Sequence, residues 1–239
     1  MGVSLIQRVN ILPELTQAHC TVLGAWGSAT AGNKLLHLRA LDWDAFAPVN
    51  QFPTIIMYEP NEGNSFTNIG YLSLIGTLTS MSKIGITAGE KVMNVDNPKD
   101  YPLDPEITHF GKPWMFVLRD TVQFSNNIYD VENILSSADR TMKIHAGFGS
   151  YPDNTFRGVD YASNFVYFYD DKNYTHYDPV SHPQLNGTFY YNKHMQPNKD
   201  ECIANILKEK YGEITAETLF RDITGLEETG DNKLSLIHI

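Results

Sequence analysis

"CTVLGAWGSATAGNKLLHLRALDW", residues 20–43, is the stretch whose pattern decides the fold. Two apolar runs, 21–26 and 34–42, are separated by glycine, serine, threonine and asparagine, and this punctuation predicts two strands joined by a turn. One of only two cysteines in the chain, Cys20, stands at the head of the first run. It is open to three interpretations: a small buried hydrophobe, half of a disulfide, or a catalytic nucleophile.

Strand-like and helical runs alternate in blocks along the rest of the chain. Strands are predicted at 54–59, 83–89, 141–145, 162–169 and 188–191. Apolar residues at three- and four-residue spacing predict helices over 113–124 and 125–140 on one face of a sheet, with Ser125 as an N-cap. Two more helices are predicted at 200–211 and 215–223, the first stopped by Gly212. This order, without a linker, indicates one α+β domain with helices packed on sheets.

The composition limits the possible partners. The 239 residues are 42% hydrophobic, which is enough to fill a substantial core, and they carry a formal net charge of −10. Nucleic-acid binding needs clustered lysine and arginine, which the sequence lacks, so a nucleic-acid partner is excluded. No apolar stretch approaches the roughly 18 to 20 residues that span a bilayer, and the first residues do not read as a signal peptide.

Ordinary interpretations compete with a catalytic one. Cys20 and Cys202 lie far apart in the sequence, which is weak evidence for a disulfide, so both are expected to be thiols. Arg39 and Asp42 lie three apart, and strand alternation puts them on opposite faces unless the strand ends or bulges near Leu41. Taken alone, they are expected to form a surface ion pair of little consequence for stability.

Other polar motifs predict no cofactor and no metal. His176 and His182 lack a third ligand and are expected on a loop surface. The acidic stretch 170–178 lacks the glycine and the terminal glutamate of a calcium-binding EF-hand loop. Asn173 and Asn186 stand in N-glycosylation sequons, which matter only on a secretory route.

A family resemblance rests on several of these segments. Cys-Thr at 20–21, followed by Arg-Ala-Leu-Asp-Trp at 39–43, resembles the N-terminal-nucleophile (Ntn) cysteine hydrolases of the penicillin acyltransferase, acid ceramidase and N-acylethanolamine amidase group, including their protist relatives. Residues 68–91 resemble the family segment that runs through a glycine-rich turn into a strand ending in a glutamate, here Glu90. The stretches 156–164 and 187–197 resemble later family segments.

The resemblance implies an αββα sandwich, in which two stacked antiparallel sheets are flanked by helices, and a chain that starts as an inactive precursor. The Cys20 thiol would attack the carbonyl of His19, and hydrolysis would leave Cys20 with a free α-amine near pKa 8 that serves as its own base. The implied reaction is amide hydrolysis or acyl transfer at a linear C–N bond, without a cofactor.

The resemblance also implies roles for single residues. Asp42 would orient the new α-amine, and Arg39 would stabilise the thiolate and hold polar groups of the substrate. Asn192, which follows tyrosine here rather than the threonine of better-known members, would donate to the oxyanion. Glu90 would be a further carboxylate of the site, with a surface charge at a strand end as its ordinary alternative.

The same resemblance predicts the organisation of the chain. Residues 1–19 are expected to be the remnant of a propeptide or small subunit, 20–233 a C-terminally shortened catalytic domain, and 234–239 a sequencing-adapter scar. The expected partners are a small-molecule acyl amide, lipid amides included, and the chain's own N-terminal fragment, retained after cleavage. The expected location of the full-length protein is lysosomal or secreted.

Two other classes stay open. One is an aromatic-rich extracellular binding module with a structural cysteine, which predicts no cleavage. The other is a papain-like protease in which His145 or His194 is the partner of Cys20, although that family carries its nucleophile on a helix rather than at the head of a strand.

Overall fold

A computed structural model of the chain describes residues 3–15, 19–42, 51–93, 104–174, 178–193, 196 and 199–225. The expected scar at 234–239, together with His176 and His194, lies outside these residues. Within the described part, no helix combines the length and the apolar character needed to cross a membrane.

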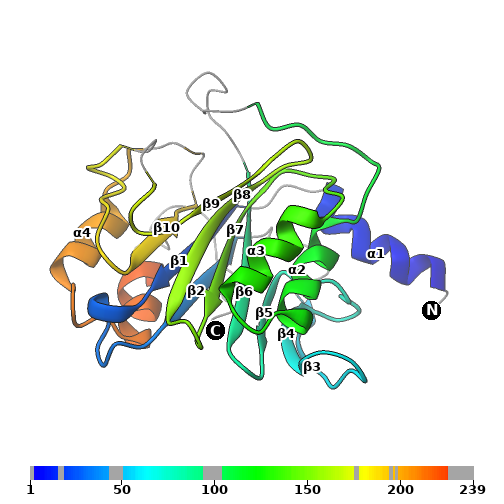
Figure 1. Ribbon diagram of the computed structural model, residues 1–239, viewed down its shortest axis with the longest axis horizontal. Coiled ribbons are helices and arrows are strands. Elements are labelled where there is room, and N and C mark those ends of the chain that lie inside the picture. The colour runs from blue at the N-terminus through cyan, green and yellow to red at the C-terminus, as the bar shows by residue number, and fades with distance from the viewer. Residues whose placement is uncertain are drawn as a thin grey trace.

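Strands and helices follow one another in the predicted blocks (Figure 1). The strands are β1 (His19–Ala25), β2 (Leu36–Asp42), β3 (Pro53–Tyr58), β4 (Phe66–Tyr71), β5 (Thr79–Ser82), β6 (Ile86–Val92), β7 (Ile144–Ser150), β8 (Thr155–Tyr161), β9 (Val166–Tyr169) and β10 (Thr188–Tyr191). The helices are α1 (Val3–Leu15), the 3-10 turn η1 (Gly27–Ala29), α2 (Trp114–Phe124), α3 (Ile128–Ser137), α4 (Cys202–Glu209) and the π-helix η3 (Thr218–Thr224).

Two antiparallel sheets form the centre of the molecule. The larger sheet has the order β3-β4-β5-β6-β7-β8-β9, so its strands pair in the order of the sequence, and the smaller sheet has the order β10-β1-β2. β6 and β7 are paired although α2 and α3 separate them in the chain. The two helices therefore leave the sheet and return to it, and they cover one of its faces (Figure 1).

Three apolar clusters show how the layers pack. Trp114 and Leu118 of α2 and Val131 of α3 belong to the core on the helix face of the larger sheet. Leu207 of α4 and Ile223 of η3 belong to the core on the outer face of the smaller sheet. The third cluster contains residues of both sheets and is mostly aromatic: Val22, Trp26, Phe156, Tyr169, Tyr174, Phe189 and Tyr191. The layers are helix, sheet, sheet, helix, which confirms the predicted α+β sandwich.

Glycines let the two sheets approach each other closely. A Cβ at Gly147 of β7 would lie 2.3 Å from Cγ1 of Val22, and a Cβ at Gly158 of β8 would lie 2.0 Å from the Phe189 ring. Side chains of the smaller sheet therefore rest directly on the backbone of the larger one, which determines where β1 crosses it.

The sequence patterns did not predict every strand and helix of the structure. β4, β5 and β8 have no predicted counterpart, because the buried polar residues Asn68, Ser80 and Asp160 break the apolar pattern of a strand. The helix α1 was not predicted either. The predicted cap at Ser125 is wrong: Ser125 ends α2, and Asn127 caps α3 by accepting a 2.9 Å hydrogen bond from Asp130 N. Beyond Glu90, the predicted strand end, β6 continues to Val92.

Candidate active site

Cys20 lies at the start of β1, with its side chain directed between the two sheets. It shares a strand face with Val22, which belongs to the core between the sheets, because strand side chains alternate. The cysteine is fully buried. In the pairing of β1 with β2, Cys20 lies opposite Leu41 and His19 lies opposite Asp42. The bond between His19 and Cys20 is therefore at the end of this strand pair.

Arg39 reaches the thiol from the neighbouring strand, where it pairs with Val22. Its Nη2 donates to Cys20 Sγ at 3.4 Å and also to Oε1 of Glu90, while its Nε donates to the Glu90 carbonyl oxygen at 3.2 Å. The arginine crosses Gly89, where a Cβ would lie 3.0 Å from Arg39 Cγ. The expected surface position of Arg39 is wrong: the residue is 1% exposed, because the two sheets enclose it.

Glu90 completes the group from β6. Its Oε1 accepts from Cys20 Sγ at 3.9 Å, and the residue is 4% exposed, so the alternative of a surface charge is also wrong. Burial raises the pKa of Glu90, and the Arg39 guanidinium opposes that rise. We call Cys20, Arg39 and Glu90 the thiol cluster.

The thiol cluster has the chemistry of an activated cysteine. A cation 3.4 Å from sulfur favours the thiolate, which is the nucleophilic form of cysteine. A carboxyl group at the same sulfur, with its pKa raised above the ordinary value by burial, is placed to accept the thiol proton.

Asp42 and His19 are placed by their backbone only. Their pairing at the end of β1 and β2 brings the Asp42 backbone to within one register step of Cys20. Their side chains lie outside the described part of the structure. The expected contact of Asp42 with the α-amine of Cys20 stays a prediction.

Asn192 follows β10, the other neighbour of β1. The pairing of β10 with β1 ends at Tyr191 and Val22, so Asn192 continues toward the start of β1. It is 1% exposed, and its Oδ1 accepts from Gln196 Nε2 at 2.6 Å. Only Nδ2 of this side chain can donate, so it is the group of Asn192 that could face an oxyanion. Sequence reasoning missed Gln196, because no local pattern marks a loop glutamine that orients another side chain.

His145 belongs to a buried polar group that the sequence did not reveal. Its Nδ1 lies 2.7 Å from Asp160 Oδ1, the Tyr191 hydroxyl donates to the same oxygen at 2.8 Å, and the His145 and Tyr191 rings stack at 4.3 Å. The hydrogen bonds described for the Cys20 sulfur go to the other two members of the thiol cluster. The papain-like pairing of Cys20 with His145 is therefore absent from the described contacts.

The described candidate ligands lie apart from one another, and His176 is outside the described residues. No group of three or more His, Cys, Asp or Glu side chains suited to a metal occurs among the described residues. His182, expected on a loop surface, is buried and stacks on Tyr190 at 4.7 Å. Cys202 is exposed at the start of α4, and no disulfide joins it to Cys20.

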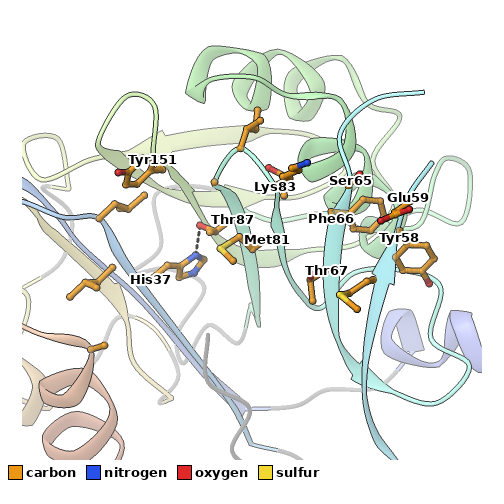
Figure 2. A pocket seen from close by; sticks show the side chains of 17 residues that line it. His37, Tyr58, Glu59, Ser65, Phe66, Thr67, Met81, Lys83, Thr87 and Tyr151 are labelled. Carbon is orange, nitrogen blue, oxygen red and sulfur yellow. Dashed lines mark hydrogen bonds between the residues drawn. The ribbon is translucent and has the colours of Figure 1, made fainter. Parts of the chain in front are cut away.

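A groove of about 720 Å³ lies beside the thiol cluster, between β2 and strands β3–β6 (Figure 2). His37, two residues from Arg39 on β2, lines it and approaches Thr87 Oγ1 through Nδ1 at 2.7 Å. Burial and the Arg39 charge lower the pKa of His37 to about 3, so its imidazole is neutral. Cys20 is not among the residues that line this groove.

Comparison of the sequence with known proteins finds two relatives, and comparison of the structure with solved structures identifies the fold. No family model matches the chain. It is 37% identical over 230 residues to protein dcd1B and 33% identical over 239 residues to protein dcd1A, both of Dictyostelium discoideum. These matches cover 94% and 95% of this chain but 44% and 52% of the two relatives, so the chain spans about half of their length.

Among solved structures, the Caenorhabditis elegans ortholog of N-acylethanolamine-hydrolyzing acid amidase matches with a TM-score of 0.63 at 12% identity over 89% of both chains. A mutant of conjugated bile acid hydrolase from Clostridium perfringens gives 0.45 at 13% identity, over 80% of this chain and 57% of that one. The stacked antiparallel sheets, the helix layers on either side and the match to the amidase ortholog together show that this chain has the fold of the Ntn hydrolases.

Proposed function

We propose that this chain is a self-processing cysteine amidase or acyltransferase that acts on a linear amide C–N bond. The observation that carries the proposal is the thiol cluster: a buried cysteine at the head of a strand, with a guanidinium at 3.4 Å and a carboxylate at 3.9 Å from its sulfur. The cluster sits at the end of the β1–β2 pair in an Ntn-hydrolase fold, next to the bond between His19 and Cys20.

The first reaction is maturation. Cys20 Sγ attacks the carbonyl carbon of His19, the C–N bond breaks, and the acyl group moves from nitrogen to sulfur as a thioester. Water then cleaves the thioester, which frees the His19 carboxylate and restores the thiol. Glu90 accepts the thiol proton at the start, because its Oε1 is the carboxylate oxygen at the sulfur, and the same proton goes to the Cys20 nitrogen as the C–N bond breaks.

The second reaction uses the new chain terminus. The α-amine of Cys20, with an ordinary pKa near 8, takes the thiol proton as the sulfur attacks a substrate amide, and Asp42 orients that amine. Asn192 Nδ2 stabilises the oxyanion, a role worth roughly 10² to 10³ in rate in other acyl-transfer enzymes. Arg39 stabilises the negative charge that develops on the sulfur as the thiol proton leaves. The amine product leaves, and water or another amine resolves the thioester.

The N-terminal fragment has the contacts to stay bound after cleavage. In α1, Asn10 Oδ1 accepts from the backbone nitrogens of Ile75 and Gly76, and Asn10 Nδ2 donates to Ser73 O at 2.8 Å. Glu14 accepts from Trp114 N at 3.2 Å. These polar bonds attach α1 to the loop between β4 and β5 and to the start of α2 without a covalent link, which supports retention of the fragment.

We propose a small-molecule acyl amide as substrate, lipid amides included; the amidase ortholog is named for hydrolysing N-acylethanolamines. A lysosomal or secreted location fits this chemistry. On such a route Asn186, exposed in a turn, is the better glycan acceptor, because the Asn173 amide already donates to Phe168 O and accepts from Asp170 N.

The test is the mass and N-terminal sequence of the purified chain after incubation at mildly acidic and neutral pH. We expect two fragments that co-elute, the larger beginning at Cys20, and we expect Cys20→Ala to stay whole. Cys202→Ala is the matched control, because that thiol is exposed and lies outside the thiol cluster. A wild-type chain that stays uncut, with Cys20 inert to acyl-amide probes, would instead favour the binding-module alternative.

A further inference from the structure

Three glycines form a row across the inner face of the larger sheet, the face turned toward the smaller sheet. Gly89 of β6 pairs with Gly147 of β7, and Gly147 pairs with Gly158 of β8. The smaller sheet passes over this row: Arg39 crosses Gly89, and a Cβ at Gly147 would meet Val22. Val22 and Arg39 are themselves paired, so the glycine row marks one level of the contact between the sheets.

The next row on the same face is polar and buried. Two residues along each strand from the glycines, Lys91 pairs with His145, and His145 pairs with Asp160. Strand side chains alternate, so these three lie on the inner face, as the glycines do. We call Lys91, His145 and Asp160 the polar row; all three residues are buried.

The nucleophile lies at the level of the polar row. His37 of β2 contacts Thr87 of β6. Two residues later in both strands, Arg39 crosses Gly89. β2 therefore follows β6 in the same direction, and the next step of two residues carries the β1–β2 pair to Cys20, beside the polar row. No residue of the polar row takes part in the proposed reaction.

Tyr191 connects β10 of the smaller sheet to the polar row. Its hydroxyl donates to Asp160 Oδ1 at 2.8 Å, and its ring stacks on His145 with the centroids 4.3 Å apart. Apolar contacts between the sheets have no preferred direction, whereas a hydrogen bond restricts both distance and angle. This buried bond therefore fixes the end of β10, a strand of four residues, against the larger sheet.

We propose that Tyr191 and Asp160 are positioning residues for Asn192, which follows Tyr191 directly and continues toward the start of β1. The inference rests on the proposed function, in which Asn192 Nδ2 donates to the oxyanion. Such a donor acts because it is in place before charge develops, and a misplacement of about 1 Å can cost roughly 10²-fold in rate. Gln196 restrains the side chain of Asn192 by donating to its Oδ1, while Tyr191 restrains its backbone.

Tyr191→Phe removes the hydrogen bond and keeps the stacked ring. The Asp160 carboxyl group retains two other partners, His145 Nδ1 at 2.7 Å and the Tyr169 hydroxyl of β9, so the change does not strand a buried charge. Tyr169→Phe is the matched control, because it removes a hydroxyl from the same carboxyl group but on a strand that does not lead to Asn192. Both variants should lower the urea midpoint by similar amounts.

The kinetic test uses the full 239-residue chain and a fluorogenic fatty-acyl amide of aminocoumarin. Tyr191→Phe should lower kcat about tenfold with little change in KM, because the oxyanion donor is displaced rather than removed. Tyr169→Phe should keep kcat within about twofold of wild type, since Asn192 stays in place. In an Asn192→Ala background, Tyr191→Phe should have no further effect on kcat, because no amide is left to position.

Hydrogen exchange tests the positioning role without any activity. Amides in peptides that cover residues 188–193 should exchange faster in Tyr191→Phe than in wild type or in Tyr169→Phe. If the wild-type chain neither cleaves itself nor hydrolyses the amide, the proposed function fails, and unchanged exchange in Tyr191→Phe would overturn the inference as well. If wild type is active, the positioning role is overturned when Tyr191→Phe keeps its kcat, matches Tyr169→Phe, or loses as much kcat in the Asn192→Ala background.

Discussion

Replacing Arg39 with methionine should lower the free energy of unfolding, because the buried Glu90 carboxylate of the thiol cluster loses its ion-pair partner. Arg39 and Glu90 are 1% and 4% exposed and form a direct ion pair between the sheets. Methionine fills much of the same volume but leaves the Glu90 carboxylate buried without its cation. Removal of one partner of a buried ion pair costs about 3 to 5 kcal/mol of unfolding free energy, whereas a surface pair would cost below about 1 kcal/mol.

The loss of unfolding free energy in Arg39→Met should depend on pH in a definite direction. Burial raises the folded-state pKa of Glu90 above its ordinary value of 4.5, so the folded state binds this proton more readily than the unfolded state. Loss of Arg39 raises that pKa further. The penalty of Arg39→Met should therefore be largest at neutral pH and should shrink as the pH falls through the folded-state pKa of Glu90, where the carboxyl becomes neutral.

The assay is urea unfolding at several pH values for Arg39→Met, Glu90→Gln and the double variant. Because the two residues are in contact, we expect the double variant to lose about 1 to 3 kcal/mol less than the sum of the two single losses. Arg39→Lys keeps the charge but loses the fork of donors, and it should fall between wild type and Arg39→Met. A loss below about 1 kcal/mol for Arg39→Met at pH 7, or a loss that grows on acidification, would refute the reasoning.

Three further predictions concern packing, pH and catalysis. Gly158→Ala should cost about 1 to 3 kcal/mol in urea unfolding, because its Cβ would lie 2.0 Å from the Phe189 ring. The His37 contribution to stability should be lost as the pH drops from 6.5 toward 3, because its depressed pKa lets only the unfolded chain take up that proton. His37→Gln should therefore be less destabilised by acid than wild type, by roughly 2 to 4 kcal/mol. Asn192→Ala should lower kcat for amide hydrolysis roughly 10² to 10³-fold with little change in KM, and equal rates would remove Asn192 from the oxyanion site.

Part of the site was visible in the sequence. Cys20, Arg39 and Glu90 were named from their order along the chain, and the structure brings their side chains together from three strands in two sheets. Only the ordinary alternatives for Arg39 and Glu90, which placed them on the surface, are wrong, because a surface charge and a buried one can have the same sequence spacing. The sequence named His145 only as an alternative partner of Cys20, and its contact with Asp160 had no local signal because the two residues lie 15 positions apart on paired strands. Gln196 was missed although Asn192 is only four residues away, because a loop sequence does not show which of its side chains meet.

The sequence by itself determined which segments form most strands and helices, because apolar periodicity and turn residues act locally. It also carried the order of thiol, guanidinium and carboxylate. Only the tertiary structure decided that two sheets stack over glycines, that Arg39 and Glu90 are buried at the sulfur, and that Met57 of β3 and Met81 of β5 are exposed. The physical reason is that burial and charge pairing between sheets depend on which strands cross, and the crossing is set by long-range packing rather than by neighbours in the chain.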